Sequence, residues 1–104
     1  MTRIFKILPR ADWERSLLLG RFEGSAVDIA DGFIHFSTAD QVDETARRHF
    51  AGQANLVVLI VEADTLGAAL RWEPSRGGAL FPHLYAPLDV TRVISVEAMD
   101  DPRP

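Results

Sequence analysis

The stretch Leu56-Val57-Val58-Leu59-Ile60-Val61 is the longest apolar run in the chain. It contains no polar residue, and most of its members are branched at Cβ, which favours extended backbone. An apolar strand without alternation is typical of the centre of a sheet, where both faces are buried. We therefore expect residues 56–61 to form the central strand. The run is far shorter than the roughly 20 residues that cross a bilayer, so no membrane segment is expected.

Two strands and two helices are predicted before this run. Pro9 stops the first strand, and Gly20 ends the first helix because glycine accepts the left-handed backbone of a helix end. Trp13 is expected to pack under the first strand. Thr38 and Gln41 are spaced as a capping box, so the second helix is expected to start at Thr38. The predicted elements are a strand at residues 4–8, a helix at 10–19, a strand at 33–36 and a helix from 38 to Gly52.

The pattern after the central run is less regular. Residues 64–70 predict one or two helical turns, and residues 91–99 predict a final strand. The glycines and prolines between residues 72 and 78 predict a structured loop, followed by a short strand that ends near Tyr85. Strands outnumber helices, and two main helices cannot cover a fully parallel sheet. The sequence therefore predicts an α+β fold with a mixed, mostly antiparallel sheet.

Composition limits the classes of function. The chain has 104 residues, which is one domain's worth; we expect a core over about residues 3–99 and a loose tail over 100–104. The formal charge of −4 makes nucleic-acid binding an unexpected function. With no cysteine, disulfides and thiolate metal sites are excluded. The N-terminus lacks the apolar core of a signal peptide, so a cytoplasmic protein is expected. Nothing in the sequence identifies the oligomeric state.

The first candidate site lies in the segment DGFIHFST, residues 31–38. His35 and Ser37 share one face of the predicted strand. Thr38 opens the predicted helix, and the free N–H groups of a helix N-terminus suit a phosphate or carboxylate. Two simpler interpretations stay open: His35 is a buried core histidine, and Thr38 only caps its helix. Nearby, Asp28 and Asp31 are expected in a turn rather than in a metal site.

The second candidate site joins WEPSRGG, residues 72–78, to FPHLY, residues 81–85. Arg76 is a natural partner for phosphate or carboxylate. His83 and Tyr85 alternate along the strand and share one face, where the Tyr85 ring could stack on a base. In the simpler interpretation, Tyr85 and Phe81 are core aromatics and Arg76 pairs with Glu73. A metal site of His35, His83 and Glu73 has no fixed spacing to test, and no metal is expected.

The chain resembles a bacterial family of unknown function, DUF952. The resemblance rests on Trp13, GRFEGS (20–25), DGFIHFST (31–38), SRGG (75–78) and FPHLY (81–85), and it covers nearly the whole chain. It implies a fold similar to that of ADP-ribosyltransferases, with a split, mixed sheet and a cleft that binds NAD in those enzymes. His35 then matches a histidine that contacts the ribose and adenylate part of NAD, and Tyr85 matches an aromatic that packs on nicotinamide.

Those enzymes often have a glutamate late in the chain that supports the oxocarbenium-like transition state, and this sequence departs from that pattern. Glu97 lies on the polar side of an ordinary strand, and Glu73 comes too early in the chain. The RNA 2′-phosphotransferases of the same superfamily use histidines and arginines instead, and His35, Arg76 and His83 are similar to that set.

The sequence thus predicts a cleft that binds NAD or another phosphorylated nucleotide, with glycosyl or phosphoryl transfer as the expected chemistry. In this hypothesis His35 orients the ribose, Ser37, Thr38 and Arg76 hold phosphate, His83 is the acid/base, and Tyr85 is the stacking surface. Two alternatives are a non-catalytic module that binds an acidic metabolite and a protein–protein adaptor.

Overall fold

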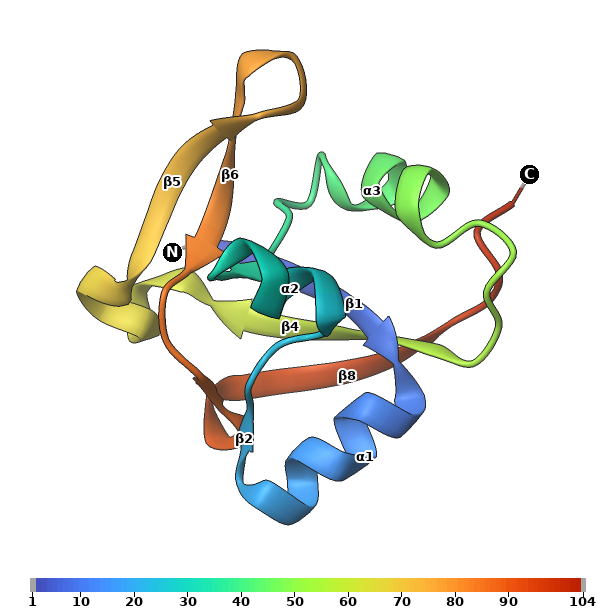
Figure 1. Ribbon diagram of the computed structural model, residues 1–104, viewed down its shortest axis with the longest axis horizontal. Helices are drawn as coiled ribbons and strands as arrows, with labels where there is room; N and C mark the ends of the chain where they lie inside the picture. The colour runs from blue at the N-terminus through green and yellow to red at the C-terminus, as the bar shows by residue number, and fades with distance from the viewer. Residues whose placement is uncertain (1, 104) are drawn as a thin grey trace.

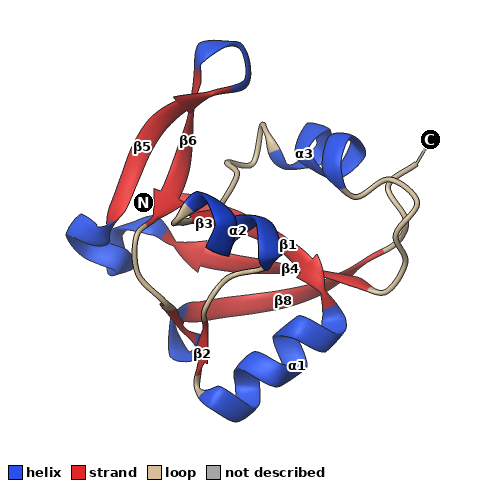
Figure 2. Cartoon of the chain, in the orientation of Figure 1, coloured by secondary structure: helices blue, strands red, loops and turns tan. Residues whose placement is uncertain are grey.

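The computed structural model describes residues 2–103, except for the side chain of Arg76. Helices or 3-10 turns separate consecutive strands, except between β6 and β7 (Figures 1 and 2). The strands are β1 (Arg3–Pro9), β2 (Arg21–Phe22), β3 (Ile34–His35), β4 (Leu56–Glu62), β5 (Leu70–Ser75), β6 (Ala79–Leu84), β7 (Leu88–Asp89) and β8 (Val93–Met99). The helices are α1 (Arg10–Leu19), α2 (Ala26–Asp31), α3 (Val42–His49) and the 3-10 turns η1 (Ala63–Ala69), η2 (Arg76–Gly78) and η3 (Val90–Arg92).

The predicted central strand is confirmed. β4 lies between β1 and β8 and pairs with both in antiparallel register, with Lys6 opposite Leu59 and Leu59 opposite Val96. Every residue from Leu56 to Val61 is buried. Its two faces pack against different elements. One face meets a cluster that includes Trp13 of α1, and the other meets a cluster under α3 that includes Ala46.

Two smaller sheets complete the α+β fold. One has the order β3-β6-β5, and the other pairs β2 with β7. A single antiparallel bridge between Phe5 and Ser37 connects β1 to the segment after β3. Every strand pair within residues 2–103 is antiparallel, so the expectation of a mixed sheet is corrected.

The loop predicted at residues 72–78 is corrected, whereas the short strand predicted after it is confirmed as β6. Both belong to a hairpin, in which β5 pairs with β6 and Trp72 stands opposite Pro82. Proline usually argues against an inner strand because it cannot donate to the ladder. Here Pro82 instead accepts, through its carbonyl, from the N–H of Phe36 at 3.0 Å. The turn is made by Gly77 and Gly78, whose φ angles are 67° and 87°.

The start of α3 is also corrected. The regular helix begins at Val42, after the Thr38 that was expected to open it. The capping pair forms in part, since Gln41 Oε1 accepts from the Thr38 N–H at 3.0 Å. The amide of Gln41 also donates to the carbonyl of Leu80 at 2.8 Å, which connects α3 to the hairpin. The intervening turn therefore bonds to the hairpin through Gln41 and to the helix through the Thr38 carbonyl, which accepts from the Val42 N–H at 3.0 Å.

The remaining elements agree with the sequence in most respects. The first helix and its Gly20 end are confirmed, as are the turns at η1. The strand expected at 33–36 is limited to Ile34–His35. In the predicted tail, Asp101 accepts from the Gly52 N–H at 2.8 Å, and Pro104 lies outside the described residues. No helix within residues 2–103 is long and apolar enough to cross a membrane.

Two leucines test the role of β4. Leu59 is fully buried, whereas Leu18 on α1 is 89% exposed. Leu59→Ala leaves a cavity and is expected to lower the free energy of unfolding by about 2–5 kcal/mol. Leu18→Ala is the matched control and should change it by less than about 0.5 kcal/mol. Urea denaturation measures both, and equal effects would contradict a core centred on β4.

Candidate functional site

Three of the sequence-predicted residues, His35, Ser37 and His83, line one groove of about 660 Å³. The groove borders β1 and lies between α2, the segment after β3, α3 and the hairpin, and Figure 1 shows these elements around β1. A volume of this size is ordinary for a small-molecule site. Aromatic side chains also line it: Phe5, Phe36, Phe50 and Phe81. The groove therefore combines apolar walls with a few polar side chains.

Asp28 organises one wall of this groove from a buried position. It stands at the third position of α2, where it forms a capping box with Ser25. Its Oδ2 atom accepts from the Ser25 N–H at 2.9 Å. Its other oxygen, Oδ1, accepts from the His35 backbone N–H at 3.1 Å and lies 2.5 Å from His35 Nδ1. Asp28 is 2% exposed. One carboxylate thus holds the start of α2 and the strand that carries His35.

Lys6 provides the opposite charge. Its Nζ lies 3.0 Å from Oδ1 and 2.8 Å from Oδ2 of Asp28. Lys6 projects from the same side of β1 as the core residues Ile4 and Leu8, and it is 4% exposed. Burial lowers the pKa of Lys6, which the adjacent Asp28 offsets only in part. Burial alone would raise the pKa of Asp28, but hydrogen bonding from His35 and the charge of Lys6 hold it well below its ordinary value.

The His35 ring lies between two carboxylates. Nδ1 faces Asp28, and Nε2 lies 2.9 Å from Oδ2 of Asp31. A carboxylate can only accept hydrogen bonds, so both contacts form together when both ring nitrogens carry hydrogen. Asp31 is the last residue of α2, where the helix dipole disfavours negative charge. Its pairing with His35 offsets that cost.

His83 is oriented in the same way by the hairpin. Its Nδ1 lies 2.9 Å from Glu73 Oε1, which also accepts from the Tyr85 hydroxyl at 2.6 Å. Hydrogen bonds from Tyr85 and His83 lower the pKa of Glu73. The bond between Tyr85 and Glu73 also raises the pKa of Tyr85. Glu73 therefore acts as a charged acceptor and Tyr85 as a donor. His83 itself is 5% exposed.

Phe33 connects the two histidines. Its ring stacks on His83 at a centroid distance of 4.1 Å and tilts against His35 at 4.5 Å and Tyr85 at 5.2 Å. The centroids of His35 and His83 are 5.6 Å apart. Two imidazoles, each paired with a carboxylate through Nδ1, thus lie side by side at the groove.

The other predicted residues have different positions. The Ser37 hydroxyl lies 3.0 Å from that of Thr45, and its backbone pairs with Phe5. The Thr38 amide already donates to Gln41, so it is not a free helix N-terminus. Tyr85 shares a face with His83 as predicted, but its ring contacts Phe33 and Arg71 and is not part of the groove lining.

The remaining residues of the second candidate site are Phe81 and Arg76. Phe81 is buried, as expected of a core aromatic. The predicted phosphate role of Arg76 concerns a side chain that lies outside the described residues.

Sequence reasoning missed Lys6 and Asp28 and misjudged Glu73. Two signals were present: a lysine inside the apolar strand IFKIL, and a serine three residues before Asp28, as in a capping box. Glu73 was considered as a partner of Arg76, as a metal ligand or as a displaced catalytic glutamate, and not as the partner of His83. Within residues 2–103, no group of three or more His, Asp or Glu side chains is arranged to hold a metal ion.

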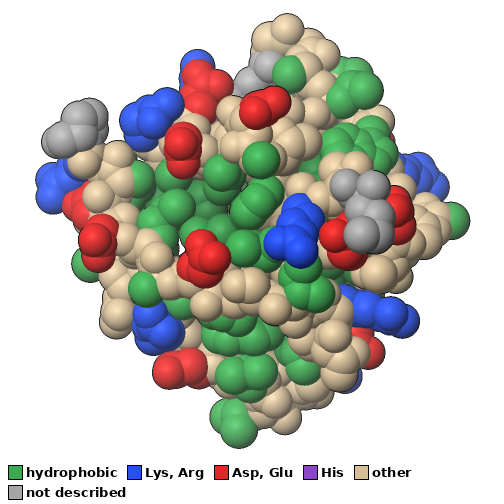
Figure 3. Space-filling view, turned by 180° about the vertical axis from the view of Figure 1, so that it is seen from behind, with side chains coloured by type: hydrophobic (Ala, Val, Ile, Leu, Met, Phe, Trp, Pro, Cys, Tyr) green, Lys and Arg blue, Asp and Glu red, His purple; other side chains and the backbone are tan. Residues whose placement is uncertain are grey.

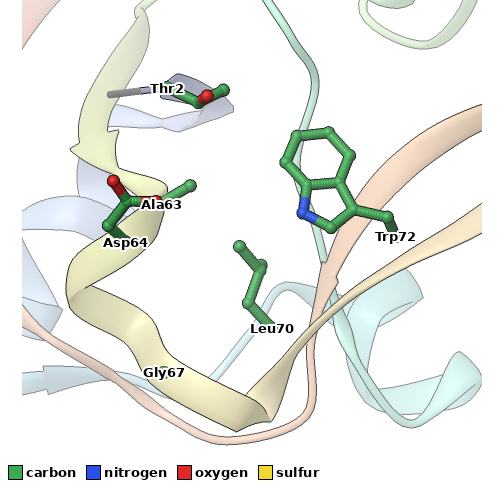
Figure 4. Close-up of a pocket in the computed structure, with 6 residues that line it drawn as sticks. All are labelled: Thr2, Ala63, Asp64, Gly67, Leu70 and Trp72. Atoms are coloured by element: carbon green, nitrogen blue, oxygen red, sulfur yellow. The ribbon is translucent and has the colours of Figure 1, made fainter.

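A second, smaller cavity of about 470 Å³ lies between η1 and β5. Figure 4 shows the Trp72 ring facing Ala63 and Leu70 across it. None of the residues that line it is a predicted site residue. Figure 3 shows the molecule from behind the view of Figure 1. Hydrophobic side chains gather around a hollow on this face, and no histidine is visible there. The groove at β1 is therefore the candidate site.

The Lys6–Asp28 pair gives an ordered pair of stabilities. Asp28→Asn leaves the Lys6 charge buried without its partner, which typically costs about 3–5 kcal/mol. Lys6→Met should cost less, because the carboxylate keeps its donors on Ser25 and His35. Chemical denaturation gives both values. A larger loss for Lys6→Met would contradict the central position of Asp28.

Asp28 also predicts a pH dependence. Its pKa is depressed in the folded protein, so below about pH 4, the ordinary value for aspartate, the unfolded chain binds a proton that the folded chain does not. The free energy of unfolding should therefore fall as the pH decreases through this range, by about 1–3 kcal/mol from this group. Urea midpoints between pH 6 and pH 2.5 measure the loss. The double variant Lys6→Met, Asp28→Leu should lose less free energy of unfolding over this pH range. The same loss as in the unmodified protein would assign the effect to other carboxylates.

Comparison with known proteins identifies relatives. A family model described as "Protein of unknown function (DUF952)" matches residues 7–96. The crystal structure of Protein CC0527 from Caulobacter crescentus is 60% identical in sequence, with a TM-score of 0.94 over 95% of this chain and 87% of that one. The solution NMR structure of CC0527 gives a TM-score of 0.86 over 96% and 86% of the two chains. The search of curated proteins finds no match. The chain belongs to the DUF952 family.

Proposed function

We propose that the groove binds NAD or another phosphorylated nucleotide and that the protein transfers a glycosyl or phosphoryl group from it. One observation carries this proposal. His35 and His83, each paired with a carboxylate through Nδ1, lie with ring centroids 5.6 Å apart and line the same groove. Paired imidazoles at an apolar groove suit proton transfer, since a neutral imidazole carries one nitrogen that donates and one that accepts.

His83 is the acid/base in this proposal. Glu73 accepts from Nδ1, which leaves Nε2 as the ring nitrogen that exchanges a proton with the ligand. Tyr85 holds the same oxygen of Glu73 and so positions the carboxylate. This role for Tyr85 replaces direct stacking on the ligand, because both Phe33 and Arg71 already contact its ring.

His35 binds the ligand. Asp28 fixes the ring through Nδ1, and Asp31, whose side chain is 48% exposed, holds Nε2 from the solvent side. A ligand oxygen reaches Nε2 when the Asp31 side chain turns away. The Ser37 hydroxyl and the hairpin that carries Arg76 provide further polar contacts, and the phenylalanines of the groove pack against the base.

We also propose that the fold is similar to that of ADP-ribosyltransferases. The support is the division into two three-stranded sheets joined at the bridge between Phe5 and Ser37, with the groove beside that joint. Glu97 is exposed on β8, whereas Glu73 lies against His83. We therefore assign to Glu73 the role that a late glutamate has in those enzymes, namely to support the transition state.

A thermal-shift panel tests nucleotide binding. NAD, ADP-ribose, ATP, cyclic and 2′-phosphorylated ribonucleotides and inorganic phosphate are compared. A ligand at 100 times its Kd adds about 2.7 kcal/mol, or several degrees in Tm for a domain of this size. His35→Gln should remove the shift. If no nucleotide shifts the Tm but small carboxylic acids do, the alternative of a non-catalytic module for an acidic metabolite replaces this proposal.

Substitution of Glu73, but not of Glu97, should lower turnover. Glu73→Gln weakens the charged acceptor of His83 and should lower the rate of nucleotide breakdown about 10- to 100-fold, because acid–base catalysis commonly contributes 10²–10⁴-fold. Glu97→Gln is the matched control on β8 and should leave the rate unchanged. Product analysis by chromatography against a heat-treated sample measures both. Equal rates for the two variants would remove Glu73 from the mechanism.

A further inference from the structure

Four charged side chains form a row at the groove. Lys6 bonds to Asp28, and Asp28 lies against Nδ1 of His35. Nε2 of the same ring lies against Asp31. The two carboxylate contacts require hydrogen on both ring nitrogens, which gives the imidazole a positive charge. The row therefore alternates in sign, and its two cations balance its two carboxylates.

The two carboxylates differ in how firmly they are held. The Asp28 side chain is 1% exposed and also accepts from Ser25. The Asp31 side chain is 48% exposed and lines the groove, where it accepts from Nε2 of His35 at 2.9 Å. Asp31 is also the last residue of α2, where the helix dipole disfavours negative charge. Asp31 is therefore the member of the row that turns away at the least cost.

The position at Nε2 suits an anion. When Asp31 turns away, the His35 ring presents a donor and an unbalanced positive charge to the groove. A neutral hydroxyl replaces the hydrogen bond but not the charge. An anionic oxygen replaces both, and hydrogen bonds between charged groups are roughly twice as strong as those between neutral ones. The group that takes the place of Asp31 should therefore resemble its carboxylate in charge.

We propose that the Asp31 carboxylate occupies the position of the ligand's anionic group and competes with that group for Nε2 of His35. Under the proposed function, on which this step rests, the anionic group is a phosphate of the nucleotide. His35 then binds phosphate rather than a ribose hydroxyl, and α2 carries an internal competitor of the ligand. A competitor that holds the site in about nine molecules out of ten raises the apparent Kd about tenfold.

Asp12 provides a matched control. It lines the same groove from α1, but its carboxylate pairs with Arg15. Asp12→Ala therefore removes one negative charge from the groove without uncovering His35. Asp31→Ala removes the same charge and uncovers Nε2. The difference between the two variants separates competition at His35 from a general effect of charge.

Calorimetric titration with AMP and with adenosine tests the proposal, because the two probes differ only in the phosphate. Asp31→Ala should lower the Kd for AMP about tenfold and change the Kd for adenosine less than about twofold. Inorganic phosphate should gain affinity as AMP does. Asp12→Ala should change each Kd less than about twofold at about 0.15 M salt, which screens charges that are not in contact.

The ring nitrogens of His35 give a second readout that needs no substitution and serves if Asp31→Ala fails to fold. In the unmodified protein labelled with ¹⁵N and ¹³C, AMP should shift the Nε2 signal of His35 and the carboxyl carbon signal of Asp31. The Nδ1 signal should move much less, because Asp28 keeps its contact with that nitrogen.

Three results would overturn the inference: an equal gain in affinity for adenosine and AMP, an equal gain in Asp31→Ala and Asp12→Ala, or an Nε2 signal that neither AMP nor inorganic phosphate moves. If nucleotides shift the Tm while any of these occurs, the proposed function stands and this inference fails. If inorganic phosphate moves Nε2 and gains affinity in Asp31→Ala while no nucleotide shifts the Tm, the proposed function fails and the anion position at His35 stands.

Discussion

The contact between Asp28 and its donors is the constraint on which the rest of the structure depends. One buried carboxylate receives Lys6 from β1, Ser25 from the start of α2 and His35 from β3. A buried charge is tolerated only when it is paired and hydrogen-bonded. Because its partners come from three segments, meeting that requirement fixes those segments relative to one another.

The groove follows from how the sheets are divided. β1 pairs fully with β4 on one side and only through Phe5 with Ser37 on the other. Within residues 2–103 no further strand pairing extends this isolated bridge, and the groove borders β1 beside it. The hairpin of β5 and β6 brings His83 to the same place, opposite His35 in register. A break in strand pairing thus creates the space, and the two histidines border it.

Local patterns predicted those parts of the fold that depend on neighbours in sequence. The central strand, the first strand and the helix that ends at Gly20 follow from apolar runs and glycine chemistry. The capping-box spacing could mark Asp28 only as part of a helix start, because its pairing with Lys6, 22 residues away, is a tertiary contact. The hairpin was missed because Pro74, Gly77 and Gly78 were taken to mark a loop, whereas Pro74 lies within β5 and the glycines make the turn. Both histidines were found as site candidates, but their carboxylate partners depend on tertiary contacts that spacing does not encode.

The short helix α2 has a consequence for how the groove forms and is lost. It has six residues, well below the roughly 12–15 at which an isolated helix is even marginally stable. Its end carries Asp31 against the helix dipole, and Val27 and Ile29 are exposed, so little apolar burial supports it. What holds it is the bonding of its two aspartates to β1 and β3. The helix therefore depends on those contacts: when Asp28 and Asp31 separate from Lys6 and His35, α2 and this wall of the groove are lost together, and few buried apolar contacts oppose such a local opening.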